Sequence, residues 1–200
     1  EANNHQVKKI CEEADKYNFK SVCVNPCYVE LCNYQLEDSE VCTVIGFPLG
    51  TNSTSTKIYE TIKSIEDGAD EVDMVINNGW MKSKKYNLIL KELTEVAKIC
   101  IKENILSKLI LETCLLNETE IIIASLLAKK AGFDFVKTST GFNSAGAKVE
   151  DVKLMREVVG PKMGVKASGG VRTRDDALLM LKAGANRIGA SKGIEIIQAD

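Results

Sequence analysis

The sequence has little of what several classes of protein require. It holds a single histidine, His5, and no pair of cysteines spaced as C-x-x-C, so a zinc ion would find few ligands and we expect no metal. No apolar run reaches the length of a transmembrane helix, and the first 20 residues do not resemble a signal peptide. The 26 lysine and arginine residues nearly balance the 28 aspartate and glutamate residues, and the formal net charge is −2. We therefore expect neither nucleic acid nor a membrane as a partner.

Disulfide bonds are not expected either, although the chain has seven cysteines. Seven is an odd number, and most of these residues lie in apolar runs, as Cys23 does within Ser21-Val22-Cys23-Val24. A chain of 200 residues can bury a large core without cross-links, so we interpret the cysteines as reduced thiols packed as small hydrophobic side chains. Reduced thiols and the lack of a signal peptide predict a cytoplasmic protein.

What the chain does have is a regular alternation of short apolar runs with segments of helical period. Strands are predicted at 21–26, 41–48, 71–77, 108–115, 135–141, 164–170 and 187–191. Helical periodicity occurs at 7–14, 88–97, 121–131, 149–159 and 175–183. Such alternation predicts a parallel sheet, and the strand spacing fits the roughly 31 residues that each unit of a (β/α)8 barrel uses.

Polar residues at alternate positions of the strands favour a barrel over an open sheet that is covered on both faces. Val72 and Met74, for example, alternate with Glu71 and Asp73. We predict one α/β domain over residues 1–200, a parallel (β/α)8 TIM barrel whose polar strand residues point inward. Only seven strands can be counted, and the chain opens where the helix of the first unit would begin, so we expect the domain to lack its first strand at the amino terminus.

Two internal repeats align these strands with one another. The pattern G-x-[DN]-x-[VI]-x occurs at 68–73, 132–137 and 184–189, and its sixth position holds Asp73, Lys137 and Gly189. The pattern V-K-x-S-x-G occurs at 136–141 and 165–170 and places Lys137 and Lys166 at matching heights. The repeats therefore predict that two lysines and an aspartate meet inside the barrel.

Lys137, Lys166 and Asp73 admit two interpretations. The first is a structural cluster of ion pairs, since such networks occur without catalysis. The second is covalent catalysis, because a lysine beside another cation loses its proton more readily and its neutral amine can form a Schiff base with a carbonyl. In that case Asp73 would move protons or hold the second lysine in place.

Glycine-rich loops follow the last two predicted strands, where TIM barrels often bind phosphate. Their backbone N–H groups can approach an anion, and a helix start at Gly193 would add a favourable dipole, although ordinary tight turns are the alternative. The sequence leaves the roles of two charged residues undecided. Lys192 is either a phosphate contact or a solvated surface lysine, and Glu112 is either catalytic or a buried structural acid.

Over nearly its whole length the chain resembles the deoxyribose-phosphate aldolase family of class I aldolases. The most specific motifs are E-V-D-M-V-I-N at 71–77, E-T-C-L-L at 112–116, V-K-T-S-T-G-F at 136–142 and V-K-A-S-G-G-V-R at 165–172. The resemblance implies that Lys137 forms the Schiff base and that Lys166 perturbs it and joins Asp73 in a proton relay, without a cofactor. It implies a phosphate site made by the backbone of Gly169, Gly170, Gly189, Ala190 and Ser191. Weaker candidates for the lining of the pocket are Cys23, Thr138 and Ser168.

The implied reaction is the reversible cleavage of 2-deoxy-D-ribose 5-phosphate to D-glyceraldehyde 3-phosphate and acetaldehyde, in the breakdown of deoxyribonucleosides. The expected partners are this phosphorylated sugar and further copies of the chain, in a homodimer or a larger homo-oligomer. One alternative is another phosphate-binding barrel, an isomerase or decarboxylase in which the lysines only bind substrate. The other is a barrel without catalysis that serves as a binding or scaffold protein.

Overall fold

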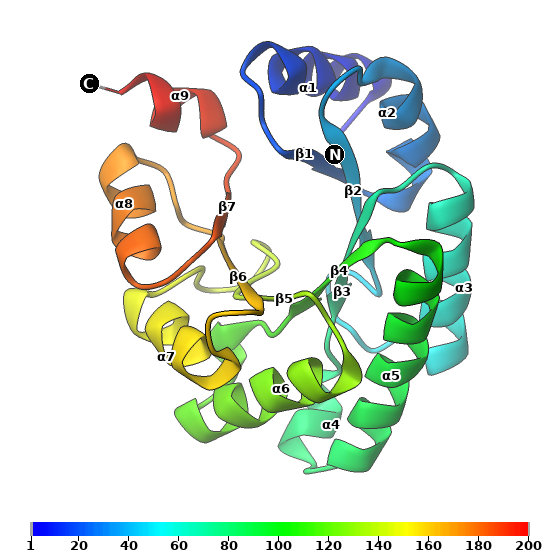
Figure 1. Cartoon of the computed structure of the whole chain (residues 1–200), viewed down its shortest axis with the longest axis vertical. Coiled ribbons are helices and arrows are strands. Elements are labelled where there is room, and N and C mark those ends of the chain that lie inside the picture. The colour runs from blue at the N-terminus through cyan, green and yellow to red at the C-terminus, as the bar shows by residue number, and fades with distance from the viewer. Residues whose placement is uncertain (1, 200) are drawn as a thin grey trace.

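The computed structural model describes residues 2–199, which form a curled sheet of seven parallel strands (Figure 1). The strands lie side by side in chain order: β1 (Ser21–Val24), β2 (Glu40–Ile45), β3 (Glu71–Val75), β4 (Leu106–Ile110), β5 (Phe135–Lys137), β6 (Gly164–Ser168) and β7 (Arg187–Gly189). All seven predicted strands are confirmed. Each ends earlier than predicted, because its last predicted residues belong to loops at the carboxyl edge of the sheet.

The helices lie on the outside of the curled sheet (Figure 1). They are α1 (Asn4–Lys16), α2 (Val29–Gln35), α3 (Thr54–Glu66), α4 (Asn78–Lys82), α5 (Tyr86–Glu103), α6 (Glu118–Ala131), α7 (Val149–Val159), α8 (Arg174–Lys182) and α9 (Gly193–Gln198), with short 3₁₀ turns at Pro26–Tyr28 and Thr113–Leu115. Helix α7 has the predicted bounds. The periodicity does not single out α3, because the residues that α3 buries are the polar Lys57, Thr61 and Ser64.

Parallel strands inside a ring of helices are the architecture of a TIM barrel, as predicted. Among the described residues, β1 and β7 form the two edges of the sheet, and they face each other across the curl in Figure 1. The strand alternation also has the predicted sense. Val72 and Met74 pack in the main core with Leu93 of α5, whereas Asp73 points into the barrel interior.

The G-x-[DN] turns join neighbouring strands in the same way three times. The side chain of Asp70 accepts a hydrogen bond from Val41 N, that of Asp134 from Ser107 N, and that of Asn186 from Val165 N, at 2.8, 2.8 and 3.0 Å. Each acceptor lies just before one strand and each donor lies in the preceding one. These hydrogen bonds therefore fix the register between neighbouring strands. That register brings the residues at the sixth position of the repeat, Asp73, Lys137 and Gly189, to the barrel interior.

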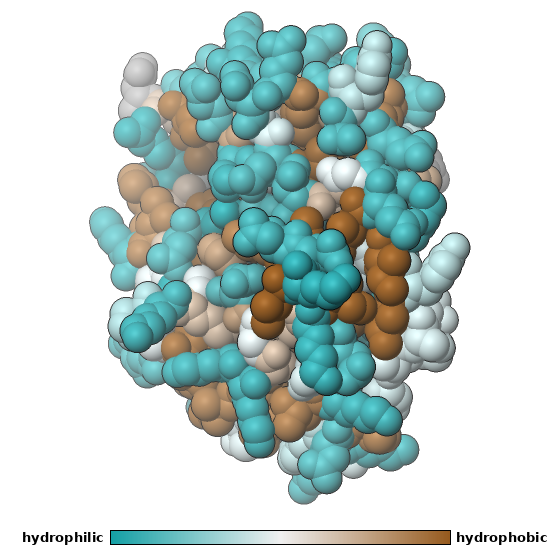
Figure 2. Space-filling view, turned by 45° about the vertical axis from the view of Figure 1, so that its right-hand side comes forward, coloured by the Kyte–Doolittle hydropathy of each residue, from teal (hydrophilic) through white to brown (hydrophobic). Residues whose placement is uncertain are grey.

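The outer surface is mainly hydrophilic on the face shown in Figure 2, with hydrophobic side chains between the polar ones. Exposed apolar side chains on α3 and α5 include Tyr59, Ile62, Leu88 and Ile101. Within residues 2–199, no helix combines the length and the apolar character needed to cross a membrane.

Candidate active site

Asp73 of β3 lies among lysine side chains inside the curled sheet. Its Oδ2 atom accepts hydrogen bonds from Lys137 Nζ at 2.8 Å and from Lys166 Nζ at 2.9 Å. Asp73 is 0% exposed, and the two lysines are 6% and 4% exposed. The structure thus brings the three predicted residues together at one oxygen atom, while their roles stay predictions.

The strand register explains how residues so far apart in sequence meet. Lys137 and Lys166 are direct partners on β5 and β6, as the second repeat predicts. Gly189 of β7 lies beside the Lys166 side chain, and a Cβ atom at Gly189 would be only 3.0 Å from Lys166 Cε. A glycine at this position therefore leaves room for the path of the lysine toward Asp73.

Lys108 of β4 is a third lysine at this site, and neither internal repeat of the sequence includes it. Its Nζ atom donates to Asp73 Oδ1 at 2.7 Å and to Glu71 Oε2 at 2.6 Å. Glu71 also accepts a hydrogen bond from Arg187 at 2.5 Å. The signal for Lys108 is the same alternation that identifies Asp73, because Lys108 is the register partner of Asp73 on β4.

The cluster holds an excess of positive charge. Its three lysines and Arg187 outnumber the carboxylates of Asp73 and Glu71 by two. Burial would raise the pKa of Asp73, but the neighbouring ammonium groups, Lys137 first among them, hold that pKa well below its usual value. Burial would lower the pKa of Lys166, but the charge of Asp73 raises it. Asp73 is therefore a carboxylate and Lys166 an ammonium at neutral pH, and the net positive charge favours an anionic ligand.

The loop that follows β6 has the backbone expected of an anion-binding turn. Gly169 and Gly170 both have positive φ angles, of +80° and +77°. The segment after β5 packs on this loop, because Ala147 N donates to Ser168 O at 3.1 Å and to Gly169 O at 2.9 Å. Positive φ angles allow the backbone of a glycine-rich turn to direct N–H groups toward an anion, which suits a phosphate. The phosphate itself stays a prediction.

The loop that follows β7 is more open. Ala190 and Ser191 are exposed, and Lys192 Nζ forms an ion pair with Glu195 at 2.8 Å on the surface of α9. This surface pair favours the interpretation of Lys192 as a solvated lysine. The structure therefore places Gly189 next to the lysine cluster and the two residues after it at the surface.

Three weaker pocket candidates occupy different positions. Cys23 is exposed and lies near Asp73, on the interior side of β1. The Thr138 hydroxyl donates to Ser168 O and accepts from Ser168 N, each at 3.0 Å, so this side chain ties β5 to β6. The Ser168 hydroxyl donates to Ser139 O at 2.8 Å. Thr138 and Ser168 thus bond to backbone atoms of the barrel.

Ser139 and Glu112 complete the neighbourhood of β5. Ser139 is fully buried two residues after Lys137, and no group of residues 2–199 forms a hydrogen bond with its hydroxyl. The Glu112 carboxylate accepts hydrogen bonds from the backbone N and the hydroxyl of Thr140, which favours a structural role in joining two loops. The strand alternation predicts that Ser139 points inward with Lys137, but it assigns Ser139 no role in the site.

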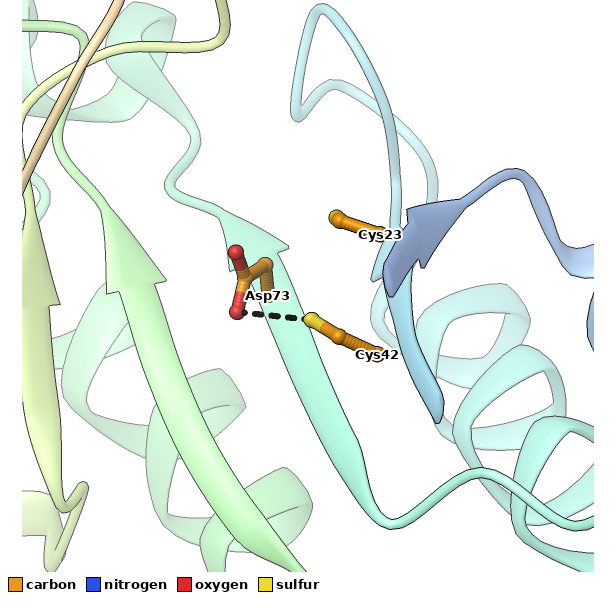
Figure 3. A group of neighbouring side chains, drawn as sticks. All are labelled: Cys23, Cys42 and Asp73. Atoms are coloured by element: carbon orange, nitrogen blue, oxygen red, sulfur yellow. Dashed lines mark hydrogen bonds between the residues drawn. The ribbon is translucent and has the colours of Figure 1, made fainter. Parts of the chain in front are cut away.

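Among residues 2–199, one group could hold a metal ion: Cys23, Cys42 and Asp73, whose ligand atoms all lie within 4.8 Å of one another (Figure 3). The Cys42 thiol donates to Asp73 Oδ1 at 3.4 Å. Lys108 Nζ contacts the same corner, 3.5 Å from Cys42 Sγ and 2.7 Å from Asp73 Oδ1. Because ammonium groups surround Asp73, this site disfavours a cation.

Comparison with known proteins identifies the family. The model of the DeoC/LacD family aldolases matches residues 1–199. The chain belongs to the DeoC/LacD aldolase family. A deoxyribose-phosphate aldolase of Clostridium novyi (strain NT) is 57% identical to it over 200 residues, which cover 99% of this chain and 90% of the relative. One of Enterococcus faecalis is 54% identical over 199 residues, or 98% and 90% of the two chains.

Solved aldolase structures share the fold of this family member. The aldolase QR15 aligns with a TM-score of 0.91 and 40% identity, over 97% of this chain and 87% of QR15. The deoxyribose-phosphate aldolase of Aeropyrum pernix, described as a unique tetrameric structure, aligns with a TM-score of 0.92 and 31% identity, over 98% and 84% of the two chains. The family expected from the sequence motifs is thereby confirmed.

Proposed function

We propose that this chain cleaves 2-deoxy-D-ribose 5-phosphate reversibly to D-glyceraldehyde 3-phosphate and acetaldehyde, with Lys137 as the nucleophile. The observation that carries the proposal is that Lys137 and Lys166 share one carboxylate oxygen of Asp73 in a buried site. An amine beside a proton carrier and a second cation is what Schiff-base chemistry requires. The names of the relatives with 57% and 54% identity support the choice of substrate.

The reaction begins when the Lys137 ammonium group passes its proton to the relay of Asp73 and Lys166, and the neutral amine attacks C1 of the open-chain sugar. Loss of water gives an iminium ion, which accepts the electron pair of the carbon–carbon bond that breaks. Asp73, 2.8 Å from Lys137 Nζ and 2.9 Å from Lys166 Nζ, is positioned to pass protons between these groups. This relay takes the proton of the C3 hydroxyl as glyceraldehyde 3-phosphate leaves. The remaining enamine is protonated and hydrolysed to acetaldehyde, which frees Lys137.

The phosphate would lie on the glycine-rich loops, with backbone N–H groups of Gly169, Gly170, Gly189, Ala190 and Ser191 as donors. The positive φ angles of Gly169 and Gly170 and the excess positive charge of the cluster support this placement. The buried Ser139 hydroxyl offers an additional hydrogen bond to the sugar. We also propose a cytoplasmic location and a homo-oligomer. The tetrameric Aeropyrum pernix relative and the exposed apolar side chains of α3 and α5 support the homo-oligomer.

Trapping of the Schiff base tests this mechanism. Sodium borohydride added during turnover of deoxyribose 5-phosphate should reduce the iminium ion and leave an adduct on Lys137, found by intact mass and peptide mapping. Lys137→Met should lose the adduct and lower kcat by about a thousand-fold or more. Lys102→Met, which removes an 81% exposed lysine of α5, is the matched control. This variant should still form the adduct on Lys137 and should keep the kcat of the parent. Cleavage without an adduct, or an adduct on another lysine, would overturn the assignment.

A further inference from the structure

Two cysteines face each other beside the proposed catalytic site. Cys23 of β1 and Cys42 of β2 are register partners, and their sulfur atoms lie within 4.8 Å of each other, on the side of the strands that faces Asp73 (Figure 3). Paired strands bring opposite Cα atoms to about 4.8 Å. That separation is inside the range of about 4.4–6.8 Å over which disulfides form. Only a short approach of the two sulfur atoms is therefore needed.

The two thiols differ in the way that an oxidisable pair requires. Cys23 is exposed, and the Cys42 thiol together with the positive charge of Lys137 lowers its pKa to about 6. A lowered pKa increases the share of Cys23 that is thiolate, which is the form that reacts with peroxide. Cys42 is fully buried and keeps its proton, since Cys23 and burial raise its pKa well above the usual value. Peroxide can therefore reach and oxidise the exposed sulfur of Cys23, and the buried thiol of Cys42 can then form a disulfide with it.

The other close pair of cysteines shows the contrast. Cys11 of α1 and Cys32 of α2 are both buried in the same apolar cluster. Burial raises the pKa of Cys11, and it raises that of Cys32 to about 12. Neither thiol ionises at neutral pH, so nearness alone does not make a reactive pair.

We propose that Cys23 and Cys42 form a disulfide under hydrogen peroxide, and that this bond switches the barrel reversibly to an inactive state. The Cys23 thiolate attacks peroxide, the O–O bond breaks, and a sulfenic acid and hydroxide result. The sulfur of Cys42 then displaces the sulfenic hydroxyl group, which leaves as water with the thiol proton of Cys42. Two thiol groups are oxidised and one molecule of peroxide is reduced to water.

The loss of activity, which rests on the proposed function, follows from the contacts of Cys42. In the reduced protein its thiol donates to Asp73 Oδ1 at 3.4 Å and accepts from Lys108 Nζ at 3.5 Å. A disulfide has no S–H to donate, and it draws the sulfur toward β1 and away from Asp73. The carboxylate that holds Lys137 and Lys166 would then lose one of its fixed partners.

The test treats the reduced protein with hydrogen peroxide, blocks remaining thiols with N-ethylmaleimide, and follows mass and aldol cleavage together. We expect a linked Cys23–Cys42 peptide in a non-reducing digest, with activity falling at least about ten-fold in the linked protein and returning after dithiothreitol. Cys23→Ser and Cys42→Ser should both abolish the link. Cys27→Ser removes an exposed cysteine that lies just after β1 and should form the link as the parent does.

Other outcomes overturn the proposal. A link to any other cysteine, or inactivation that persists in Cys23→Ser at the same rate, would show that the pair is not the switch. A complete Cys23–Cys42 link with full activity would remove the regulatory role. The mass readout does not depend on turnover, so a protein without aldolase activity that still forms the link would contradict the proposed function and not the disulfide.

Discussion

Lys108 connects the Asp73 carboxylate to the deeper ion pairs of the barrel interior. It contacts Asp73, Glu71 and Cys42 and is itself fully buried. It binds Asp73 through the oxygen that Lys137 and Lys166 leave free, so it acts by holding the carboxylate. We therefore regard Lys108 as a positioning residue.

Replacement of Lys108 by methionine should shift the pH dependence of the reaction. Lys108 is one of the charges that lower the pKa of Asp73, so the variant raises that pKa, and the acid limb of kcat/KM should move to higher pH. We also expect kcat/KM to fall by about ten-fold or more, the effect of about 1.4 kcal/mol. Lys108→Arg should restore part of the lost kcat/KM and move the acid limb part of the way back. Lys102→Met should change neither kcat/KM nor the position of the acid limb. An unchanged acid limb in Lys108→Met would argue against this coupling.

How far the site could be predicted also differs from residue to residue. Lys137, Lys166 and Asp73 occupy aligned positions of internal repeats, so sequence pattern alone groups them. Lys108 lies outside both repeats, and its role depends on the register between β3 and β4. The Cys23–Cys42 pair likewise depends on which side chains share a face and a height in the assembled sheet. Spacing along the chain does not contain that information.

At the level of elements, the strands and most of the longer helices follow from periodicity, and the turns between them follow from the G-x-[DN] repeat. Helix α3 is the instructive exception. Its buried Lys57 Nζ donates to Glu92 of α5 at 2.7 Å and to Val75 O at 2.9 Å, so a polar residue occupies a core position. A pattern of hydrophobic residues fails where an ion pair replaces an apolar contact.

The turn repeat carries a measurable part of the stability. Asp134 accepts hydrogen bonds from both the backbone N and the hydroxyl of Ser107, at 2.8 and 3.0 Å. Asp134→Ala should leave these donors without that partner and lower the free energy of unfolding by about 1–3 kcal/mol, measured by urea denaturation. Asp38→Ala, at an exposed aspartate, is the control and should stay within about 0.5 kcal/mol of the parent. Equal effects in the two variants would show that the turn side chain is dispensable.

For the molecule as a whole, the apolar core divides into two clusters. The larger one unites β3 to β6 with helices α5, α6 and α7. The smaller one consists of α1, β1 and α2 together with Val41 and Ala69. The smaller cluster buries far fewer side chains, so the amino-terminal part of the barrel has fewer apolar contacts that resist local opening.

Hydrogen exchange of the native protein should show this division directly. The amides of Val22 and Val24 in β1 should be protected at least about ten-fold less than those of Met74 in β3 and Leu109 in β4, because opening β1 disrupts only the smaller cluster. Such opening would also free Cys23 to approach Cys42. When mild urea accelerates opening, the rate of disulfide formation should therefore rise in parallel with the rate of amide exchange in β1. Equal protection in β1 and β4 would mean that the barrel opens as one unit, and the sulfur atoms would then have to meet without that motion.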